Sequence, residues 1–240
     1  MYMYLNLIVT GRRIVTVDAR NHGDSPHTDT MTYPLMAADL ASLVQRLGLT
    51  EVSLAGHSMG GRTVMMAALS GLIDIDKLIV LDISPINQKF DVTSSNEWNM
   101  EHYFHCLKSV TFNQSLSVSM ARKEADKQLA VRIKDPGLRA WLLMNMRQDP
   151  ETKEIGWRIN IDGIHQAFYK NIAKFPEVAS SYGGPTLFIG GAESDYIPVT
   201  DHDEIQEVFP RAEFRYVQGA GHWVHSQKPA EVIELIKNFL

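Results

Sequence analysis

The chain has 240 residues, 45% of them hydrophobic, and a formal net charge of −5 at pH 7. This length is enough to bury a sizeable core, either in one large domain or in a domain with an inserted lid. The small negative charge argues against nucleic acid as a partner. The single cysteine, Cys106, excludes an internal disulfide and suggests a reducing compartment. No apolar run approaches the roughly 20 residues of a membrane span.

The first third of the chain alternates strands and helices. Residues 14–17 are largely β-branched and predict a strand, and the turn-forming residues 18–26 after them predict a loop. An amphipathic helix is predicted over 32–48, followed by short apolar strands over 52–55 and 78–81. Strands that are apolar throughout and alternate with helices indicate a mostly parallel sheet with helices on both faces.

This alternation stops after about residue 85 and resumes near residue 185. The intervening residues carry helical spacing over 98–108, 120–134, 136–147 and 161–174, with a short extended piece at 156–159. Strands are predicted again over 185–190 and 212–217, and Pro229 begins a closing helix. We therefore predict a core from 1–85 and 176–240, and an inserted helical lid from 86–175.

The residues around Ser58 carry the strongest motif. Gly56, His57, Ser58, Met59 and Gly60 form a G-x-S-x-G sequence between a predicted strand and a predicted helix, the context of a nucleophile elbow. So tight a turn needs glycines where the backbone and the helix pack closely. Ser58 would then point outward at the start of the helix, where the Met59 N–H and the positive helix end can stabilise an oxyanion.

A serine nucleophile needs a base, and His222 is the candidate. It lies in a glycine-bracketed loop after the last predicted strand, at the end of the sheet where open α/β sheets bind their ligands. It also comes last in the chain order serine, acid, histidine that this fold uses. We interpret the nearby His225 as a surface or supporting residue.

Four carboxylates compete for the role of the triad acid. Asp82 directly ends a predicted strand and ranks first, and Asp162 ranks second. Proteins of this fold often carry the acid after the strand that ends here at residue 190. Counting through that loop places Ser194 at the expected position, with Glu193 and Asp195 displaced by one residue each. The sequence leaves this choice open.

Four motifs together resemble the α/β-hydrolase family. They are residues 17–25, 56–61, 81–85 and 219–223, and the similarity runs from residue 11 to the end of the chain. More narrowly, they resemble the branch that contains a bacterial short-acyl esterase and animal mitochondrial proteins of the abhydrolase domain-containing protein 11 type. In the bacterial members the acid matches Asp82, whereas in animal members the aspartate that matches Asp162 has also been assigned this role.

The resemblance implies an activity and a location. It implies hydrolysis of carboxylic esters or acylglycerols, with no metal or organic cofactor, and a mitochondrial address for eukaryotic members. Residues 1–10 have neither a basic start nor a small-residue cleavage site, so no signal peptide is predicted. Apart from the mitochondrial address, we expect a soluble intracellular protein, and the sequence indicates no particular protein partner.

One departure from the family concerns the start of the chain. Relatives place two strands, a third strand with a His-Gly oxyanion loop and a helix before the position of Gly11, where this chain has ten residues. We therefore expect an N-terminally shortened form in which residues 2–9 are the stub of that helix or, failing that, an antiparallel strand. Such a chain is predicted to be weakly active or inactive, and prone to aggregate.

The sequence therefore predicts a serine hydrolase that acts on a small acyl ester or lipid through a Ser-His-Asp triad and an acyl-enzyme. Ser58 is the predicted nucleophile, His222 the base, and Asp82 the acid that orients it. The alternative is a catalytically impaired, truncated isoform that binds or regulates without turnover. An acyl pocket is considered at apolar lid residues, although ordinary packing accounts for each one alone: Trp98, Phe104, Trp141, Leu142 and Phe168.

Overall fold

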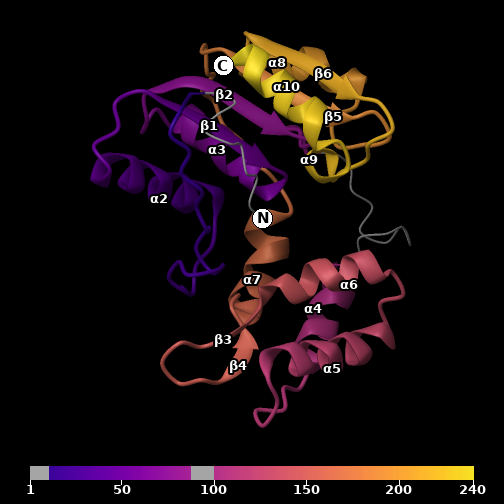
Figure 1. Ribbon diagram of the computed structural model, residues 1–240. Helices are drawn as coiled ribbons and strands as arrows, with labels where there is room; N and C mark the ends of the chain where they lie inside the picture. Colours follow the sequence, from indigo (N-terminus) through magenta and orange to yellow (C-terminus); the bar gives the residue numbers. More distant parts are fainter. Residues whose placement is uncertain (1–10, 88–99) are drawn as a thin grey trace. The chain divides into compact units, whose positions relative to one another are not determined.

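The computed structural model describes residues 11–87 and 100–240. These residues form two compact units (Figure 1). Of the described residues, the sheet unit takes 11–17, 32–87 and 170–240, and the helical unit takes 18–31 and 100–169. The predictions for residues 2–9 and for Trp98 lie outside the described residues.

The sheet unit contains four parallel strands in the order β1-β2-β5-β6 (Figure 1). These strands are β1 (Val52–His57), β2 (Ile75–Leu81), β5 (Thr186–Gly191) and β6 (Ala212–Val217). Because all four run in the same direction, their carboxyl ends and the loops that follow them meet at one edge of the sheet. The predicted parallel sheet is confirmed.

Helices cover both faces of this sheet, because side chains alternate between the faces along each strand. On one face lies α3 (Met59–Ser70), and a side chain at its Gly61 would come within 3.2 Å of Val80. The opposite face packs Ile79 and Leu81 against Val232 of α10 (Pro229–Phe239). The remaining helices of this unit are α2 (Tyr33–Arg46), α8 (His202–Val208), α9 (Val224–Gln227) and the 3-10 turn η3 (Val199–Asp201).

The strand predicted over residues 14–17 is wrong. These residues form no ladder, and the side chains of Val15 and Val17 are 40% and 47% exposed. A β-branched run becomes a strand only where a second strand satisfies its backbone groups. Among the described residues β1 pairs with β2 alone, and no strand pairs with 14–17.

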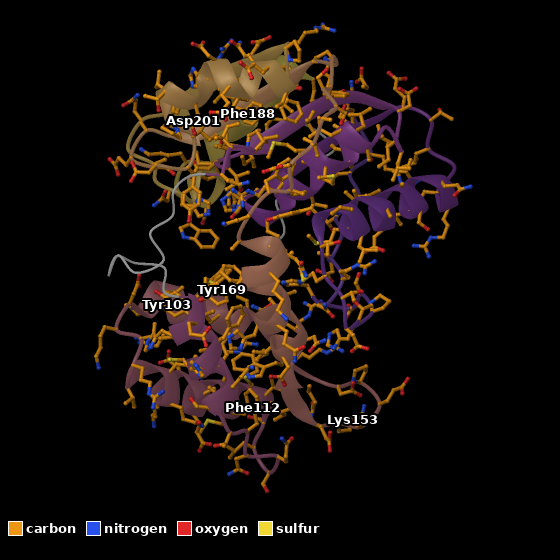
Figure 2. The ribbon with its side chains drawn as sticks, turned by 180° about the vertical axis from the view of Figure 1, so that it is seen from behind. Tyr103, Phe112, Lys153, Tyr169, Phe188 and Asp201 are labelled. Atoms are coloured by element: carbon orange, nitrogen blue, oxygen red, sulfur yellow. The ribbon has the colours of Figure 1, made fainter. Side chains whose placement is uncertain are left out.

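The helical unit is built mainly from short helices, as its spacing predicted. Figure 2 shows Phe112 and Lys153 within this unit, Lys153 lying in the loop of a small hairpin. The hairpin pairs β3 (Met146–Gln148) with β4 (Ile155–Trp157) in antiparallel register, so residues 146–147, predicted helical, are a strand. The other elements of this unit are α4 (Met100–Ser109), α5 (Val118–Ala130), α6 (Pro136–Leu142), η1 (Leu143–Asn145) and α7 (Ile161–Ala167). The π turn η2 (Phe168–Ile172) contains the point in the sequence where the helical unit ends and the sheet unit resumes. Across the two described stretches, every helix is too short or too polar to cross a membrane.

Residues 18–31 group with the helical unit and not with the core predicted for 1–85. Polar contacts explain this difference. The Asp18 carboxylate accepts a hydrogen bond from the Arg158 guanidinium at 3.2 Å. The Asn160 backbone N–H donates to the Asn21 carbonyl at 2.9 Å, and its side-chain amide donates to the Asn21 amide oxygen at 3.1 Å.

The turn between β1 and α3 predicts opposite effects for two glycines. A side chain at Gly56 would lie 2.2 Å from the Gly60 carbonyl oxygen, which is backbone and cannot move aside, whereas one at Gly60 meets no atom within 4 Å. Gly56→Ala should therefore lower the free energy of unfolding by about 1–3 kcal/mol, as overpacking does. Gly60→Ala should leave it unchanged or raise it by up to about 1 kcal/mol, since alanine favours helix.

Thermal and denaturant unfolding of both variants beside the unmodified chain measures this difference. Equal stabilities for Gly56→Ala and Gly60→Ala would contradict the close approach of backbone in this turn.

Candidate active site

Ser58 lies on the turn between β1 and α3, as the elbow motif predicted. Its backbone has φ 53° and ψ −120°, a conformation that costs a non-glycine residue on the order of 1–3 kcal/mol. Two backbone hydrogen bonds hold it there: the Ser58 N–H donates to the Leu81 carbonyl at 3.1 Å, and the Ser58 carbonyl accepts from the Arg62 N–H at 3.0 Å. The strained turn is therefore anchored to both β2 and α3.

His222 lies in the loop after β6 and makes two contacts that bear on chemistry. Its Nε2 is 3.1 Å from Ser58 Oγ, and its Nδ1 is 2.8 Å from Asp82 Oδ2. A carboxylate at Nδ1 selects the tautomer that keeps its proton there and leaves Nε2 as an acceptor for the hydroxyl. Ser58, Asp82 and His222 follow three different strands, β1, β2 and β6, and the structure brings their side chains together.

Asp82 directly follows β2 and is fully buried. Its own N–H donates to the Ile189 carbonyl at 2.9 Å, and its φ of 48° turns the chain away from the sheet. Besides His222, the carboxylate accepts hydrogen bonds from the Gly191 N–H at 2.8 Å and from Ser194 Oγ at 2.5 Å. A carboxylate without access to water requires such donors.

The competing acids lie in other surroundings. Asp162, on α7, forms an ion pair with Lys108 at 2.6 Å and its side chain is 76% exposed. The hydrogen bond from Lys108 lowers the pKa of Asp162. In the loop after β5, the Glu193 N–H donates to the Ala220 carbonyl, and Ser194, where the acid was expected by counting, donates to Asp82 instead. The role of Ser194 as a partner of the acid was not predicted from the sequence.

Aromatic rings surround His222, and most of these contacts were not predicted from the sequence. The Tyr196 ring stacks on the His222 ring with centroids 4.0 Å apart, and the His57 centroid lies 4.7 Å from that of His222. His225, predicted as a surface or supporting residue, is buried with 7% exposure, and its centroid is 4.4 Å from that of His57. No short motif links these rings in the sequence, because they meet only after β1, β5 and β6 have paired.

Burial keeps two of these histidines neutral. Burial first, and the neighbouring His222 second, lower the pKa of His57 to about 3 and that of His225 to about 4. A neutral imidazole carries one ring proton and so is both a donor and an acceptor. At neutral pH the two rings therefore add no positive charge beside His222.

Met59 begins α3, directly after Ser58. As one of the first four residues of a helix, it has an N–H with no intrahelical acceptor, and this N–H lies at the positive end of the helix. The arrangement is compatible with the predicted oxyanion donor, which stays a prediction.

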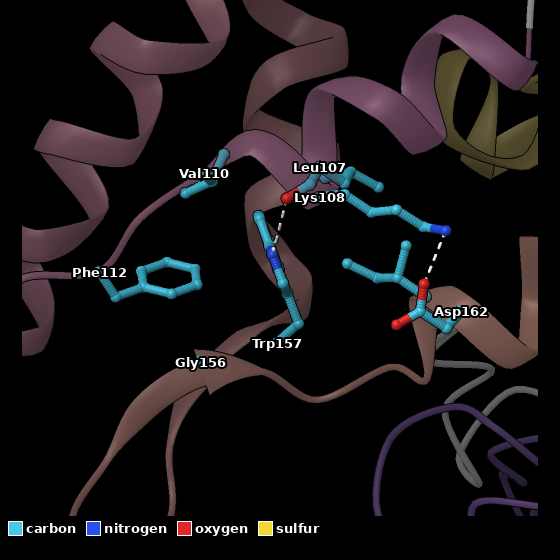
Figure 3. Close-up of a pocket in the computed structure, with 8 residues that line it drawn as sticks. Leu107, Lys108, Val110, Phe112, Gly156, Trp157 and Asp162 are labelled. Carbon is cyan, nitrogen blue, oxygen red and sulfur yellow. Dashed lines mark hydrogen bonds and ion pairs between the residues drawn. The ribbon is translucent and has the colours of Figure 1, made fainter.

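A cavity of about 410 Å³ lies in the helical unit (Figure 3). Its polar side chains are already engaged: Trp157 Nε1 donates to the Leu107 carbonyl at 3.1 Å, and Lys108 pairs with Asp162. None of the predicted acyl-pocket residues that the structure describes lines this cavity, and two of them, Phe104 and Leu142, are buried in packing. The cavity is lined by Leu107, Lys108, Val110, Phe112, Gly156, Trp157, Ile161 and Asp162.

The fold and this hydrogen-bonded serine, histidine and aspartate agree with a family comparison. Residues 4–229 match the family model described as the alpha/beta hydrolase fold. The chain therefore belongs to the α/β-hydrolase family, which confirms the predicted family and the predicted α/β-hydrolase fold. The expected loss of the first strands of this fold stays a prediction.

Relatives named as esterases or lipases are similar over nearly the whole chain. The mouse sn-1-specific diacylglycerol lipase ABHD11 is 41% identical over 235 residues, which cover 96% of this chain and 72% of that protein. The Escherichia coli esterase YbfF is 31% identical over 233 residues, 97% and 84% of the two chains. A solved structure titled marine microorganism esterase has a TM-score of 0.83 at 37% identity, covering 93% of this chain and 83% of that one. These similarities support the predicted class of carboxylester hydrolase.

Proposed function

We propose that this protein is a serine hydrolase that cleaves carboxylic esters through a Ser58, His222 and Asp82 triad. The observation that carries the proposal is the continuous hydrogen-bonded chain from Ser58 Oγ through the His222 ring to the buried Asp82 carboxylate. This order of contacts is what nucleophilic acyl transfer requires, because a serine hydroxyl reacts only when a base can take its proton. Similarity to esterases and a lipase supports the same reaction class.

The proposed acylation step follows from these contacts. Ser58 Oγ attacks the ester carbonyl carbon while its proton moves to His222 Nε2, and the carbonyl oxygen becomes an oxyanion. The N–H of Met59 donates to this oxyanion at the start of α3. The imidazolium then gives its proton to the leaving alkoxide as the carbon–oxygen bond breaks, which leaves the acyl group on Ser58.

Deacylation repeats these steps with water as the nucleophile. His222 Nε2 takes a proton from water, the hydroxide attacks the acyl carbonyl, and the proton returns to Ser58 Oγ as the acid leaves. Asp82 acts in both halves, because its hydrogen bond at Nδ1 fixes the tautomer of His222 and stabilises the imidazolium. The donors from Gly191 and Ser194 keep Asp82 oriented toward the ring.

The proposed substrate class is acyl esters, including acylglycerol-type lipids. The mouse relative's name specifies a diacylglycerol lipase and the bacterial relative's an esterase, and we extend their shared chemistry to this chain. Hydrolysis of a series of esters with increasing acyl length measures the preference. The mitochondrial location implied by the family resemblance stays a prediction, which subcellular fractionation can test.

A fluorophosphonate probe tests the proposal, because it reacts covalently only with an activated serine. We expect labelling of the unmodified chain and none of Ser58→Ala. Ser70→Ala is the matched control, since Ser70 ends the same helix and its hydroxyl contacts only nearby backbone, donating to the Ala67 carbonyl and accepting from the Leu72 N–H, so labelling should persist. A histidine base is deprotonated for most of the range from about pH 6 to about pH 9. Absence of labelling throughout this range would exclude the proposed hydrolase activity and favour a binding or regulatory protein.

Two aspartate variants test which carboxylate is the acid. Asp82→Asn keeps the size of the side chain but favours the wrong tautomer of His222, so turnover should fall by about 10⁴-fold. Asp162→Asn removes an ion pair at a side chain that is 76% exposed and should leave turnover nearly unchanged. Steady-state kinetics with one ester measures both, and the reverse ranking would assign the acid to Asp162.

A further inference from the structure

His57, the residue before Ser58, makes a hydrogen bond that the proposed reaction does not use. Its ring Nε2 lies 2.7 Å from the backbone carbonyl oxygen of His222. A carbonyl oxygen only accepts, so Nε2 carries the proton and donates it. The turn that bears Ser58 is thus bonded directly to the backbone of the residue whose ring faces Ser58.

The loop that carries His222 needs such a contact. Gly219 has a φ of 65°, and Gly221, next to His222, also has no side chain. The loop therefore has few side chains whose packing could fix its conformation. The Gly221 N–H is held by the Gln227 side chain at 2.8 Å. One residue further on, the hydrogen bond from His57 fixes the backbone of His222 itself.

We propose that His57 is a positioning residue for His222, which it holds through the Nε2–H···O=C hydrogen bond so that the imidazole meets Ser58 Oγ. This inference rests on the proposed function of the triad. Asp82 orients the ring of His222, while His57 fixes its backbone. The two constraints act on different atoms, so losing either one leaves the ring free to shift from the serine.

Surroundings that keep His57 neutral support this role. The titratable groups that face its ring are His222 and His225, at centroid distances of 4.7 Å and 4.4 Å, and the Trp223 ring lies at 5.5 Å. Burial and these two histidines lower the pKa of His57 to about 3. The ring therefore keeps one proton and one tautomer through the range in which His222 must gain and lose a proton, and it does not repel the imidazolium.

Two substitutions test the hydrogen bond. His57→Leu removes the donor, and a base displaced by about 1 Å should lower kcat on the order of 10²-fold while KM stays near its original value. His57→Gln should recover most of this loss, because the glutamine amide nitrogen can reach the former position of Nε2. His202→Leu is the matched control: His202 is also half-buried with a 2.7 Å hydrogen bond at Nε2, but its partner is the Tyr216 hydroxyl, and kcat should stay close to that of the unmodified chain.

A second measurement does not depend on activity. Nitrogen-15 NMR of the imidazole rings should show His57 as a neutral Nε2–H tautomer from about pH 5 to about pH 8, whereas an unperturbed histidine titrates in this interval. Titration of His57 near its ordinary pKa, or equal kcat in His57→Leu and His57→Gln, would overturn the inference. Failure of the triad proposal looks different: the unmodified chain would then neither hydrolyse esters nor react with the fluorophosphonate, whatever the NMR shows.

Discussion

The buried carboxylate of Asp82 is the contact on which the arrangement of this site depends. It follows β2 and accepts hydrogen bonds from Gly191 at the end of β5, from Ser194 in the loop after β5, and from His222 in the loop after β6. A charge without access to water is tolerated only where donors surround it. The need to satisfy this one group therefore ties together the loops that follow three neighbouring strands.

Asp82 and the nearby Ser58 both have strained backbones, and hydrogen bonds to the sheet stabilise both. Ser58 has a φ of 53° and Asp82 a φ of 48°, and residues other than glycine rarely adopt such positive φ angles. Each N–H donates to the carbonyl of a neighbouring strand, Ser58 to Leu81 and Asp82 to Ile189. Strain of this kind persists where the surroundings over-determine the backbone, and here it directs both side chains toward the same histidine.

The sequence was most informative where a local pattern determines the structure. Local patterns predicted the elbow turn from its glycines and the loop of His222 from the glycines beside it. Apolar strands such as the one before Asp82 predicted the sheet. The partners of these residues were not predictable, because Ser194, Tyr196 and His57 meet His222 or Asp82 only when separate strands align. The assignment of residues 14–17 as a strand failed for the same reason, since β-branched residues do not reveal whether a neighbouring strand exists.

The central claim is that an acyl group passes through Ser58 on its way from ester to water. Rapid-quench mass spectrometry during hydrolysis of a p-nitrophenyl acyl ester tests this most directly, because it detects the covalent intermediate itself. The account predicts a transient mass increase of one acyl group on the peptide that contains Ser58, formed with the first release of p-nitrophenol and lost as the ester is consumed. Steady turnover with the acyl group on another residue would contradict it.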